Sequence, residues 1–338
     1  MNHPARHGAA PARIVDVAAV AGVSAQTVSN VINGRKGFST ATRERVEQAI
    51  AALEFQPNRS AQSLRNRRTM QIGFDLTGGQ LDLSNIFAIE FLRSLASVAT
   101  AMHYQVLAFA HKTRSREQFR HALRASDVDG FVLSDSQPGD ERADVLTELG
   151  IPFVTFGRTE PDAPPTWVDI DNAAAMHPVV DRLATAGHRS FAYIGFSGSA
   201  YWDRERLQGV RDRLAEHDLT LPRRSLLRGK LHTLRPRIHQ LLEQTKPPTA
   251  IITSSDPIAV VALTAATAMG LRVGQDVAIT GFDAGALRTM VEPTLTSVRI
   301  PMETVAQSLM ERLVEELRGP TGRPGVIVPT ELIPGGSG

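Results

Sequence analysis

The fold of this chain is decided first by a stretch near the N-terminal end, Arg13-Ile-Val-Asp-Val-Ala-Ala-Val-Ala-Gly-Val-Ser-Ala-Gln-Thr-Val-Ser-Asn-Val-Ile-Asn-Gly34. An apolar stripe along a short helix is predicted by residues spaced i, i+3, i+4 and i+7, namely Ile14, Val17, Ala18 and Ala21. Gly22 then supplies the positive φ that a tight turn after a helix requires. Ser24 is placed to cap a second helix, because its hydroxyl can accept hydrogen bonds from backbone N–H groups one turn ahead.

The second helix of this stretch is predicted to have two different faces. The side chains expected to point inward are Val28, Val31 and Ile32. The outer face is small and rich in amides and hydroxyls, with Ala25, Gln26, Ser29 and Asn30. Such groups both donate and accept hydrogen bonds, which suits base edges and phosphates. Two short helices joined by a glycine turn predict a helix-turn-helix, with a plain helical hairpin whose polar face meets water as the alternative.

The charge of the chain is unevenly distributed. Residues 1–70 hold ten Lys and Arg and four Asp and Glu, a net charge of +6, although the whole chain carries only +2. The remaining residues hold 27 basic and 31 acidic side chains, a net charge of −4. A basic N-terminal fifth on an acidic body favours a nucleic-acid-binding module on a soluble carrier. A solvated basic tail is the alternative, but much of the charge lies within or between periodic helices.

The residues after the helix-turn-helix predict a third helix and then a hinge. Ser39 is placed to cap the third helix, and its apolar stripe, which closes a three-helix core, is Val46, Ala49, Ile50 and Leu53. Pro57 ends this region. Residues 58–65 are too short and polar to hold a helix alone, so they predict a hinge that folds when DNA or a partner supplies contacts, with an ordinary tether as the alternative.

From residue 71 onward, strands alternate with helices, which predicts parallel sheets covered on both faces. The predicted strands are Ile72–Leu76, Tyr104–Ala110, Asp129–Ser134, Pro152–Phe156, Phe191–Phe196, Ala250–Ser254, Val277–Phe282 and Val326–Leu332. Helix patterns include Phe87–Ala101, Ala173–Ala186, Arg204–Glu216, Ile258–Met269 and Met302–Leu317. This length exceeds one compact sheet, so two α/β lobes are expected, with a ligand site in the cleft between them.

The bulk composition excludes several classes of protein. The 338 residues contain no cysteine, so no disulfide scaffold, thiolate zinc site or thiol nucleophile is present. No stretch has the continuous apolar length of a membrane span, and the first residues lack an apolar signal segment. A cytoplasmic, nucleoid-associated protein that needs no membrane, cofactor or metal is therefore expected.

Read together, these motifs resemble the lactose-repressor/galactose-repressor (LacI/GalR) family of bacterial transcription regulators over residues 13–334. The most specific part is Asp16-Val-Ala-x-x-Ala-Gly-Val-Ser-x-x-Thr-Val-Ser-x-Val-x-Asn-Gly34. Further matches are Thr42-Arg-Glu-Arg-Val46, Pro57-Asn58, Ala61-Gln-Ser-Leu-Arg65, Val128-Asp-Gly-Phe-Val132, Gly187-His-Arg189, Arg206-Leu-Gln-Gly209, Asp256, Gly281-Phe-Asp283 and Leu295-Thr-Ser-Val-Arg299. The resemblance implies an N-terminal three-helix headpiece, a short hinge helix and a two-lobed periplasmic-binding-protein-like α/β core.

The domain boundaries expected from this resemblance divide the chain into five parts. These are a disordered arm (1–12), a helix-turn-helix domain (13–57), a hinge (58–70), an effector-binding and dimerisation core (71–334) and a tail (335–338). Within the core, the N-lobe is expected at about 71–167 plus 296–325, and the C-lobe at about 168–295 plus 326–334. The C-terminal residues show no heptad helix, so no tetramerisation segment is expected.

The resemblance also implies which residues contact DNA. The positions that match base-reading residues are Ala25, Gln26 and Asn30. The positions that match phosphate-contacting residues are Ser24, Thr27, Ser29, Asn33, Ser39 and Thr42. Leu64 matches a hinge leucine that wedges into the minor groove, with Arg65 beside it, and simple packing of Leu64 against the body is the alternative.

Effector-binding positions follow in the same way. Arg206 matches an arginine that grips sugar hydroxyls or a carboxylate, and Asp283 matches an acid that accepts from ligand hydroxyls. Other positions at or near the pocket are Ser134, Phe156, Arg158, Trp167 and Ser255. Aromatic faces beside charged groups suit a pyranose ring. The alternatives are that Arg206 pairs with Asp203 on a helix surface, that Asp283 caps a turn and that Trp167 belongs to the core.

Some residues depart from the family pattern. Gly157 stands where members often have a ligand-binding acid, Ser255 where many have Asn, and Ile300 where Gln is common. The loop at residues 77–84 is also longer than usual. These departures bear on which effector is bound.

The expected function is a homodimeric repressor that binds a palindromic double-stranded DNA operator and is controlled by a small effector, a mono- or oligosaccharide. Release and retention of DNA on effector binding both remain open. A sugar-binding transport protein shares the two-lobe body, but the basic headpiece and the missing signal segment argue against it. An α/β enzyme is disfavoured, because Gly195-Phe-Ser-Gly198 lacks the Gly-x-Ser-x-Gly spacing of a nucleophile elbow and the ten histidines form no His-x-x-x-His pair on a helix.

Overall fold

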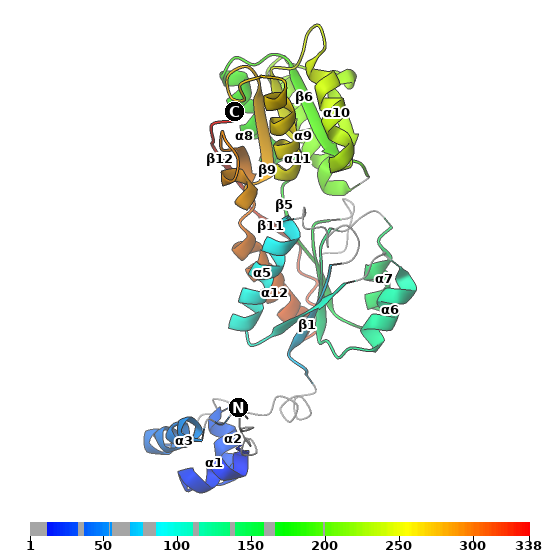
Figure 1. The fold of residues 1–338 in the computed structure, drawn as a ribbon. Coiled ribbons are helices and arrows are strands. Elements are labelled where there is room, and N and C mark those ends of the chain that lie inside the picture. Colours follow the sequence, from blue (N-terminus) through cyan, green and yellow to red (C-terminus); the bar gives the residue numbers. More distant parts are fainter. Residues whose placement is uncertain are drawn as a thin grey trace, which may run out of the picture. The chain divides into compact units, whose positions relative to one another are not determined.

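The computed structural model describes residues 12–32, 37–53, 55, 68–76, 86–110, 115–135, 139–158, 166–198 and 200–338. The chain separates into two compact units, Met1–Thr69 and Met70–Gly338 (Figure 1). The predicted arm lies almost entirely outside the described residues, and so do Asn33, Leu64 and Arg65 and most of the predicted hinge. No single helix within the described ranges is long and apolar enough to cross a membrane.

The first unit contains three helices, α1 (Ile14–Ala21), α2 (Ala25–Ile32) and α3 (Thr40–Ala52). The first two meet at 101°, within the range of a helix-turn-helix, and Gly22 at the turn has φ +64°. Ser24 Oγ accepts from the Thr27 N–H and Ser39 Oγ from the Thr42 N–H, which confirms both predicted caps. The miniature core consists of Val17, Ala18, Ala21, Val28, Val31, Val46, Ala49 and Phe55.

The N-lobe of the second unit is a six-stranded sheet in the order β11-β5-β4-β3-β1-β2. Its strands are β1 (Gln71–Asp75), β2 (Gln105–Phe109), β3 (Gly130–Leu133), β4 (Phe153–Phe156), β5 (Trp167–Ile170) and β11 (Val326–Val328), all parallel. One face packs on α5 (Ile86–Ala101) and α12 (Met302–Glu316), and the other on α6 (Arg116–Arg124) and α7 (Glu141–Glu148). The inner strands β1, β3 and β5 are therefore mostly buried, as their apolar runs predicted, whereas the edge strands β2 and β11 are largely exposed.

The C-lobe is a second six-stranded sheet in the order β12-β10-β9-β8-β6-β7. Its strands are β6 (Phe191–Phe196), β7 (Leu226–Gly229), β8 (Ala250–Thr253), β9 (Ala278–Asp283), β10 (Thr296–Arg299) and β12 (Glu331–Ile333), of which β12 is antiparallel to β10. Residues of β6 alternate between its faces: Phe191 and Tyr193 pack beside α8 (His177–Thr185) and α9 (Tyr201–Glu216), whereas Ala192 and Ile194 pack beside α10 (Leu231–Leu242) and α11 (Asp256–Ala268). Short 3-10 turns complete the lobe at Ala174–Met176, Arg223–Ser225 and Ala286–Thr289.

The chain crosses between the lobes three times, and the predicted crossing points were partly wrong. Strand β10 (296–299) belongs to the C-lobe sheet, and β11 (326–328) belongs to the N-lobe sheet, the reverse of the expected assignment. The predicted single strand 326–332 is two strands, one in each sheet. Residues 335–338 do not form a loose tail, because Ser337 is buried and its Oγ accepts from the Thr296 N–H at 2.9 Å and donates to the Ile279 carbonyl.

Several elements fall where the sequence patterns indicated none. Strands β5, β7 and β10 and helices α6, α7 and α10 were not among the predicted ranges. These four-residue strands contain the polar residues Asp169, Arg228 and Ser297, so they lack the continuous apolar run that marks the equally short strands β3 and β8.

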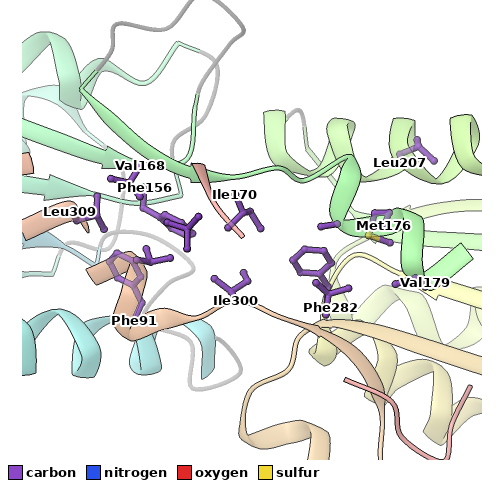
Figure 2. Close-up of a cluster of buried hydrophobic side chains, with 14 of the residues drawn as sticks. Phe91, Phe156, Val168, Ile170, Met176, Val179, Leu207, Phe282, Ile300 and Leu309 are labelled. Carbon is purple, nitrogen blue, oxygen red and sulfur yellow. The ribbon is translucent and has the colours of Figure 1, made fainter. Parts of the chain in front are cut away.

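One hydrophobic cluster runs through both lobes (Figure 2). Ile170 and Ile300, on two of the crossing segments, lie between the Phe91 and Phe156 side chains of the N-lobe and Phe282 of the C-lobe. Ile300 is only 3% exposed, so the residue that replaces the family's common Gln serves here as part of the apolar link between the lobes. This link places the carboxyl ends of the two sheets around a shared cavity.

Candidate functional site

The outer face of α2 presents the residues predicted to read bases. Gln26 is exposed, and Ala25, Ser29 and Asn30 are half-buried on the same helix. Gln26 Nε2 donates to Asn30 Oδ1 at 3.0 Å, so the two amides are aligned along one face before DNA is bound. Each amide keeps further donor or acceptor capacity for a base edge.

Four of the predicted phosphate contacts, Ser24, Thr27, Ser39 and Thr42, lie at the N-terminal ends of α2 and α3, and Ser29 lies in the middle of α2. The Ser24 and Thr27 hydroxyls lie 2.9 Å apart, and so do the Ser39 and Thr42 hydroxyls. Helix N-termini offer backbone N–H groups and a partial positive charge, which favour phosphate oxygens. Asn33, Leu64 and Arg65 lie outside the described residues, so their roles stay predictions.

A cavity of about 690 Å³ lies between the carboxyl ends of the two sheets. Its N-lobe wall contains Phe87, Ala88, Asp135, Phe156, Gly157, Asp169 and Ile170. Asn172 and the C-lobe supply the remaining wall, which includes Phe196, Ser197, Gly198, Ala200, Trp202, Asp203, Arg206, Lys230, Leu231, His232, Ser255, Pro257 and Asp283. The volume and the mixed aromatic and polar lining are those of a small-molecule site.

Arg206 is held rigidly in this wall by hydrogen bonds and aromatic rings. It is 6% exposed, its Nε donates to Asn172 Oδ1 at 2.9 Å and one terminal nitrogen donates to the Ser254 carbonyl at 2.6 Å. The guanidinium carbon lies 3.4 Å from the ring centroid of Phe282 and 4.7 Å from that of Trp202. Burial lowers the pKa of Arg206 and the nearby Asp283 opposes that shift, so the side chain stays a fixed cation that can donate to a ligand.

Asp283 ends β9 at the cavity, in a backbone conformation with φ +108°. Its carboxylate accepts from the Asp256 N–H at the start of α11. Desolvation by burial raises the pKa of Asp283 well above its ordinary value, although Arg206 acts in the opposite direction. A positive φ at a residue other than glycine is costly, and such positions concentrate at functional sites.

Ser255 lies beside Asp283 at the N-terminus of α11 and is 5% exposed. Its Oγ is buried and has no hydrogen-bond partner among the described residues. A buried hydroxyl without a partner costs free energy, which a ligand that supplies a hydrogen bond would recover.

Three of the predicted effector residues do not line the cavity. Arg158 pairs instead with Asp169 at 2.9 Å and with Glu205 at 3.1 Å, and its guanidinium lies over the Trp167 ring at 5.1 Å. Ser134 is buried beneath the cavity, and its carbonyl accepts from Arg142 at 3.0 Å. Arg158, Trp167 and Ser134 were expected at or near the pocket; they are not among its lining residues, although their neighbours Gly157 and Asp135 are, and internal ion pairs and ring contacts occupy the two larger side chains. Their part in effector binding stays a prediction.

The two ion pairs of Arg158 connect the N-lobe to the C-lobe. Arg158 follows β4 and Asp169 lies on β5, both in the N-lobe, whereas Glu205 lies on α9 of the C-lobe. Asn172 Nδ2 donates to Asp169 and to Glu205, both at 3.4 Å, while its Oδ1 accepts from Arg206. Burial raises the pKa values of Asp169 and Glu205, and the Arg158 cation opposes both shifts. Asn172, which lines the cavity, thus connects Arg206 to the ion pairs of Arg158 by hydrogen bonds.

The structure also adds cavity residues that the sequence patterns missed. Asn172 follows β5, and Lys230, Leu231 and His232 follow β7. Ligands of parallel α/β sheets bind beyond the carboxyl ends of strands, so recognising β5 and β7 would have identified these positions. Phe156 was predicted and lines the cavity, where its ring stacks on that of Phe87 with centroids 6.2 Å apart. Within the described ranges, no cluster of three or more His, Asp and Glu side chains is placed to hold a metal ion.

Comparison with known proteins identifies both units. Residues 13–58 match the family model described as bacterial regulatory proteins, lacI family, and residues 180–338 match a periplasmic binding protein-like domain. The chain is 33% identical to HTH-type transcriptional regulator CelR of Thermobifida fusca over 91% of this chain and 92% of that protein. It is 29% identical to catabolite control protein A of Staphylococcus xylosus over 94% of this chain and 97% of that protein.

Solved structures agree with these relatives. A transcriptional regulator CelR–cellobiose complex superposes with a TM-score of 0.74 at 29% identity, covering 97% of this chain and 100% of that chain. A lac repressor dimer bound to operator and an anti-inducer superposes with a TM-score of 0.77 at 25% identity, covering 97% of this chain and 99% of that chain. Headpiece, core and order along the chain all correspond, and the protein belongs to the lacI family of bacterial transcriptional regulators.

Proposed function

We propose that this protein is a dimeric repressor whose affinity for a near-palindromic operator is controlled by a sugar bound in the inter-lobe cavity. A sugar is supported as the effector by three groups along one wall of the cavity. These are the buried Arg206 guanidinium, the Asp283 carboxylate and the Ser255 hydroxyl, which has no hydrogen-bond partner among the described residues. Aromatic rings line the same cavity, and a pyranose needs both hydrogen bonds to its hydroxyls and apolar contact for its CH groups.

Two solved relatives support the proposal. One holds cellobiose, and the other is a dimer on its operator. A dimer with two-fold symmetry requires two half-sites related by the same axis, which is why a near-palindromic operator is expected.

The DNA-binding part is tested by selecting a binding site from a randomised duplex library and measuring the affinity of the full-length chain by fluorescence anisotropy. The affinity should fall steeply with salt, because the basic N-terminal residues displace counterions from DNA. Gln26→Ala should reduce affinity for the selected site by roughly 5- to 150-fold and leave binding to random DNA nearly unchanged. Equal losses on both DNAs would contradict base reading by α2.

The ligand part is tested by differential scanning fluorimetry of the full-length protein against a panel of mono- and disaccharides. A sugar that binds only the folded state raises the melting temperature. A hit should then change operator affinity, in either direction, by an amount set by its differential affinity for the two states of the protein. A complete absence of sugar binding across the panel would overturn the proposed effector class.

A further inference from the structure

The chain leaves β9 at the cavity through a strained segment, residues 283–286, which is called the 283–286 loop below. Asp283 has φ +108° and Ala284 has φ +46°, so two consecutive residues other than glycine have positive φ. Such conformations persist only where the surrounding contacts hold them. The contacts that hold this loop therefore also decide where the Asp283 carboxylate lies in the cavity wall.

Three consecutive backbone N–H groups of the 283–286 loop donate to side chains. The N–H groups of residues 284, 285 and 286 donate to Ser297 Oγ at 3.0 Å, to Asp256 Oδ2 at 3.2 Å and to Glu90 Oε1 at 2.9 Å. Ser297 and Asp256 belong to the C-lobe and are joined to each other by a hydrogen bond of 2.6 Å. Glu90 lies on α5 of the N-lobe, so the third acceptor reaches the loop from the opposite lobe.

Glycine at position 285 allows the Glu90 carboxylate to come this close. A Cβ atom at residue 285 would lie 2.7 Å from Glu90 Oε2, which is shorter than a van der Waals contact. Gly285 has φ −78°, a value that other residues adopt readily. The space needed by Glu90, and not the backbone conformation, therefore requires glycine here.

We propose that Glu90 is a positioning residue for the effector site, which holds the 283–286 loop, and with it the Asp283 carboxylate, from the opposite lobe. This proposal rests on the proposed function, in which Asp283 contacts the effector. A movement that separates α5 from the loop removes one of its three acceptors and loosens Asp283. Conversely, an effector bound to Asp283 stabilises the arrangement of the lobes in which Glu90 reaches the Ala286 N–H.

The charge of Glu90 has a second effect that must be separated from its hydrogen bond. Burial raises the pKa values of Asp256 and Asp283, and the negative charge of Glu90 contributes to both rises. The Arg288 cation opposes the rise at Asp256, and the Arg206 cation opposes it at Asp283. Glutamine at position 90 keeps an acceptor oxygen and removes the charge, so it distinguishes the two effects.

The test is hydrogen–deuterium exchange with mass spectrometry on the full-length protein without ligand, following peptides that cover residues 284–290. Glu90→Ala should speed amide exchange there by roughly 10-fold or more, because a hydrogen bond to a charged acceptor is lost. Glu90→Gln should retain most of the protection. Arg93→Ala is the matched control, because it removes an exposed charge from the same helix, and it should leave exchange in these peptides unchanged.

Gly285→Ala tests the same contact from the other side. It leaves Glu90 in place, but its Cβ displaces the carboxylate, so exchange in residues 284–290 should rise as it does in Glu90→Ala. The two changes together should add nothing to either one alone, since both remove one hydrogen bond. Calorimetry with the panel of mono- and disaccharides supplies the functional measurement. Glu90→Ala should weaken any sugar that the wild type binds by about 5- to 10-fold, and Glu90→Gln should restore most of that affinity.

The outcomes separate this proposal from the proposed function. Unchanged exchange in Glu90→Ala, or an equal rise in Glu90→Gln, overturns the hydrogen-bonding role of Glu90. A loosened loop with unchanged sugar affinity overturns the positioning of Asp283 while sugar binding itself stands. Failure of every sugar in the panel to bind overturns the proposed effector class, and the exchange measurements then still decide whether Glu90 holds the loop.

Discussion

In the N-lobe, Arg142 is buried between the carboxylates of Asp75 and Asp140, at 2.9 Å and 2.5 Å. In the C-lobe, Arg206 is equally buried but has no carboxylate within ion-pair distance among the described residues. Arg142 lies on α7, the helix after β3 of the N-lobe sheet, and Arg206 lies on α9, the helix after β6 of the C-lobe sheet. The Arg142 charge is therefore neutralised within the N-lobe, whereas Arg206 lines the cavity without a carboxylate in ion-pair distance among the described residues.

This difference suggests that the paired charge of Arg142 has a structural role and that Arg206 is available to bind a ligand. Removing one partner of a charge pair inside the protein is strongly destabilising, and such a pair offers little to a ligand, whereas a buried group that lacks a full set of partners can bind one. Gly157 lines the N-lobe wall and has no side chain to offer a ligand. Recognition is thus expected to depend mainly on the C-lobe.

The largest effect should come from breaking the internal pairing of the N-lobe. Arg142→Met leaves Asp75 and Asp140 buried without their cation, which should lower the free energy of unfolding by about 3–5 kcal/mol. Urea denaturation followed by circular dichroism measures the loss. Sugar affinity of the remaining folded protein should be unchanged, and Arg120→Met, which removes a half-exposed cation paired with Glu148, should cost about 1 kcal/mol or less.

The next effect concerns the unpaired charge of the C-lobe. Asp283→Asn and Arg206→Ala should each remove the response of operator binding to sugar and leave operator affinity without sugar intact. A buried charged group that loses its hydroxyl partner costs roughly 2–4 kcal/mol, or about 30- to 1,000-fold in sugar affinity. Anisotropy titrations of operator DNA with and without sugar test this, and a response that persists in both variants would place the effector elsewhere.

A smaller effect should come from the ion pair that joins the lobes. Arg158 and Glu205 have side chains that are 18% and 17% exposed, so solvent weakens their attraction. A double-mutant cycle with Arg158→Met and Glu205→Gln should give a coupling free energy of about 1 kcal/mol in urea unfolding. Strict additivity of the two single variants would show that the pair does not connect the lobes energetically.

A pH dependence is also expected in the C-lobe. Desolvation raises the pKa of Asp256 to about 7, against the opposing hydrogen bonds from Ser297 and the Gly285 N–H. Because the folded-state pKa exceeds the unfolded-state value, this group stabilises the fold fully at acid pH, and the contribution is lost as pH rises through about 7. Melting temperatures of the wild type should therefore fall relative to those of Asp256→Asn between about pH 4 and pH 7.5. A constant difference across that range would contradict the raised pKa.

The sequence predicted the elements whose signals are local and long enough to repeat. Ser24 and Ser39 indicate the starts of two helices because a serine hydroxyl can cap a helix, and both caps are present. Gly22 indicates a turn because glycine tolerates the positive φ that it has here. The short strands β5 and β7 carry no comparable signal, so the cavity residues Asn172 and Lys230 were missed with them. Arg158 illustrates a second limit of prediction from sequence. Its residue type suits a ligand contact, but it pairs with Asp169 and Glu205, which are distant in sequence and come close only in the fold.

The three crossings between the lobes have a consequence for the order in which the protein is made. The N-lobe sheet is finished by β11 and the C-lobe sheet by β12, so neither sheet is complete until these two strands have been synthesised. The headpiece core is complete by Phe55 and has its own apolar cluster, so it can fold while the rest is still being translated. A chain cut short before Val326 would carry the intact DNA-reading helix with neither regulatory sheet complete.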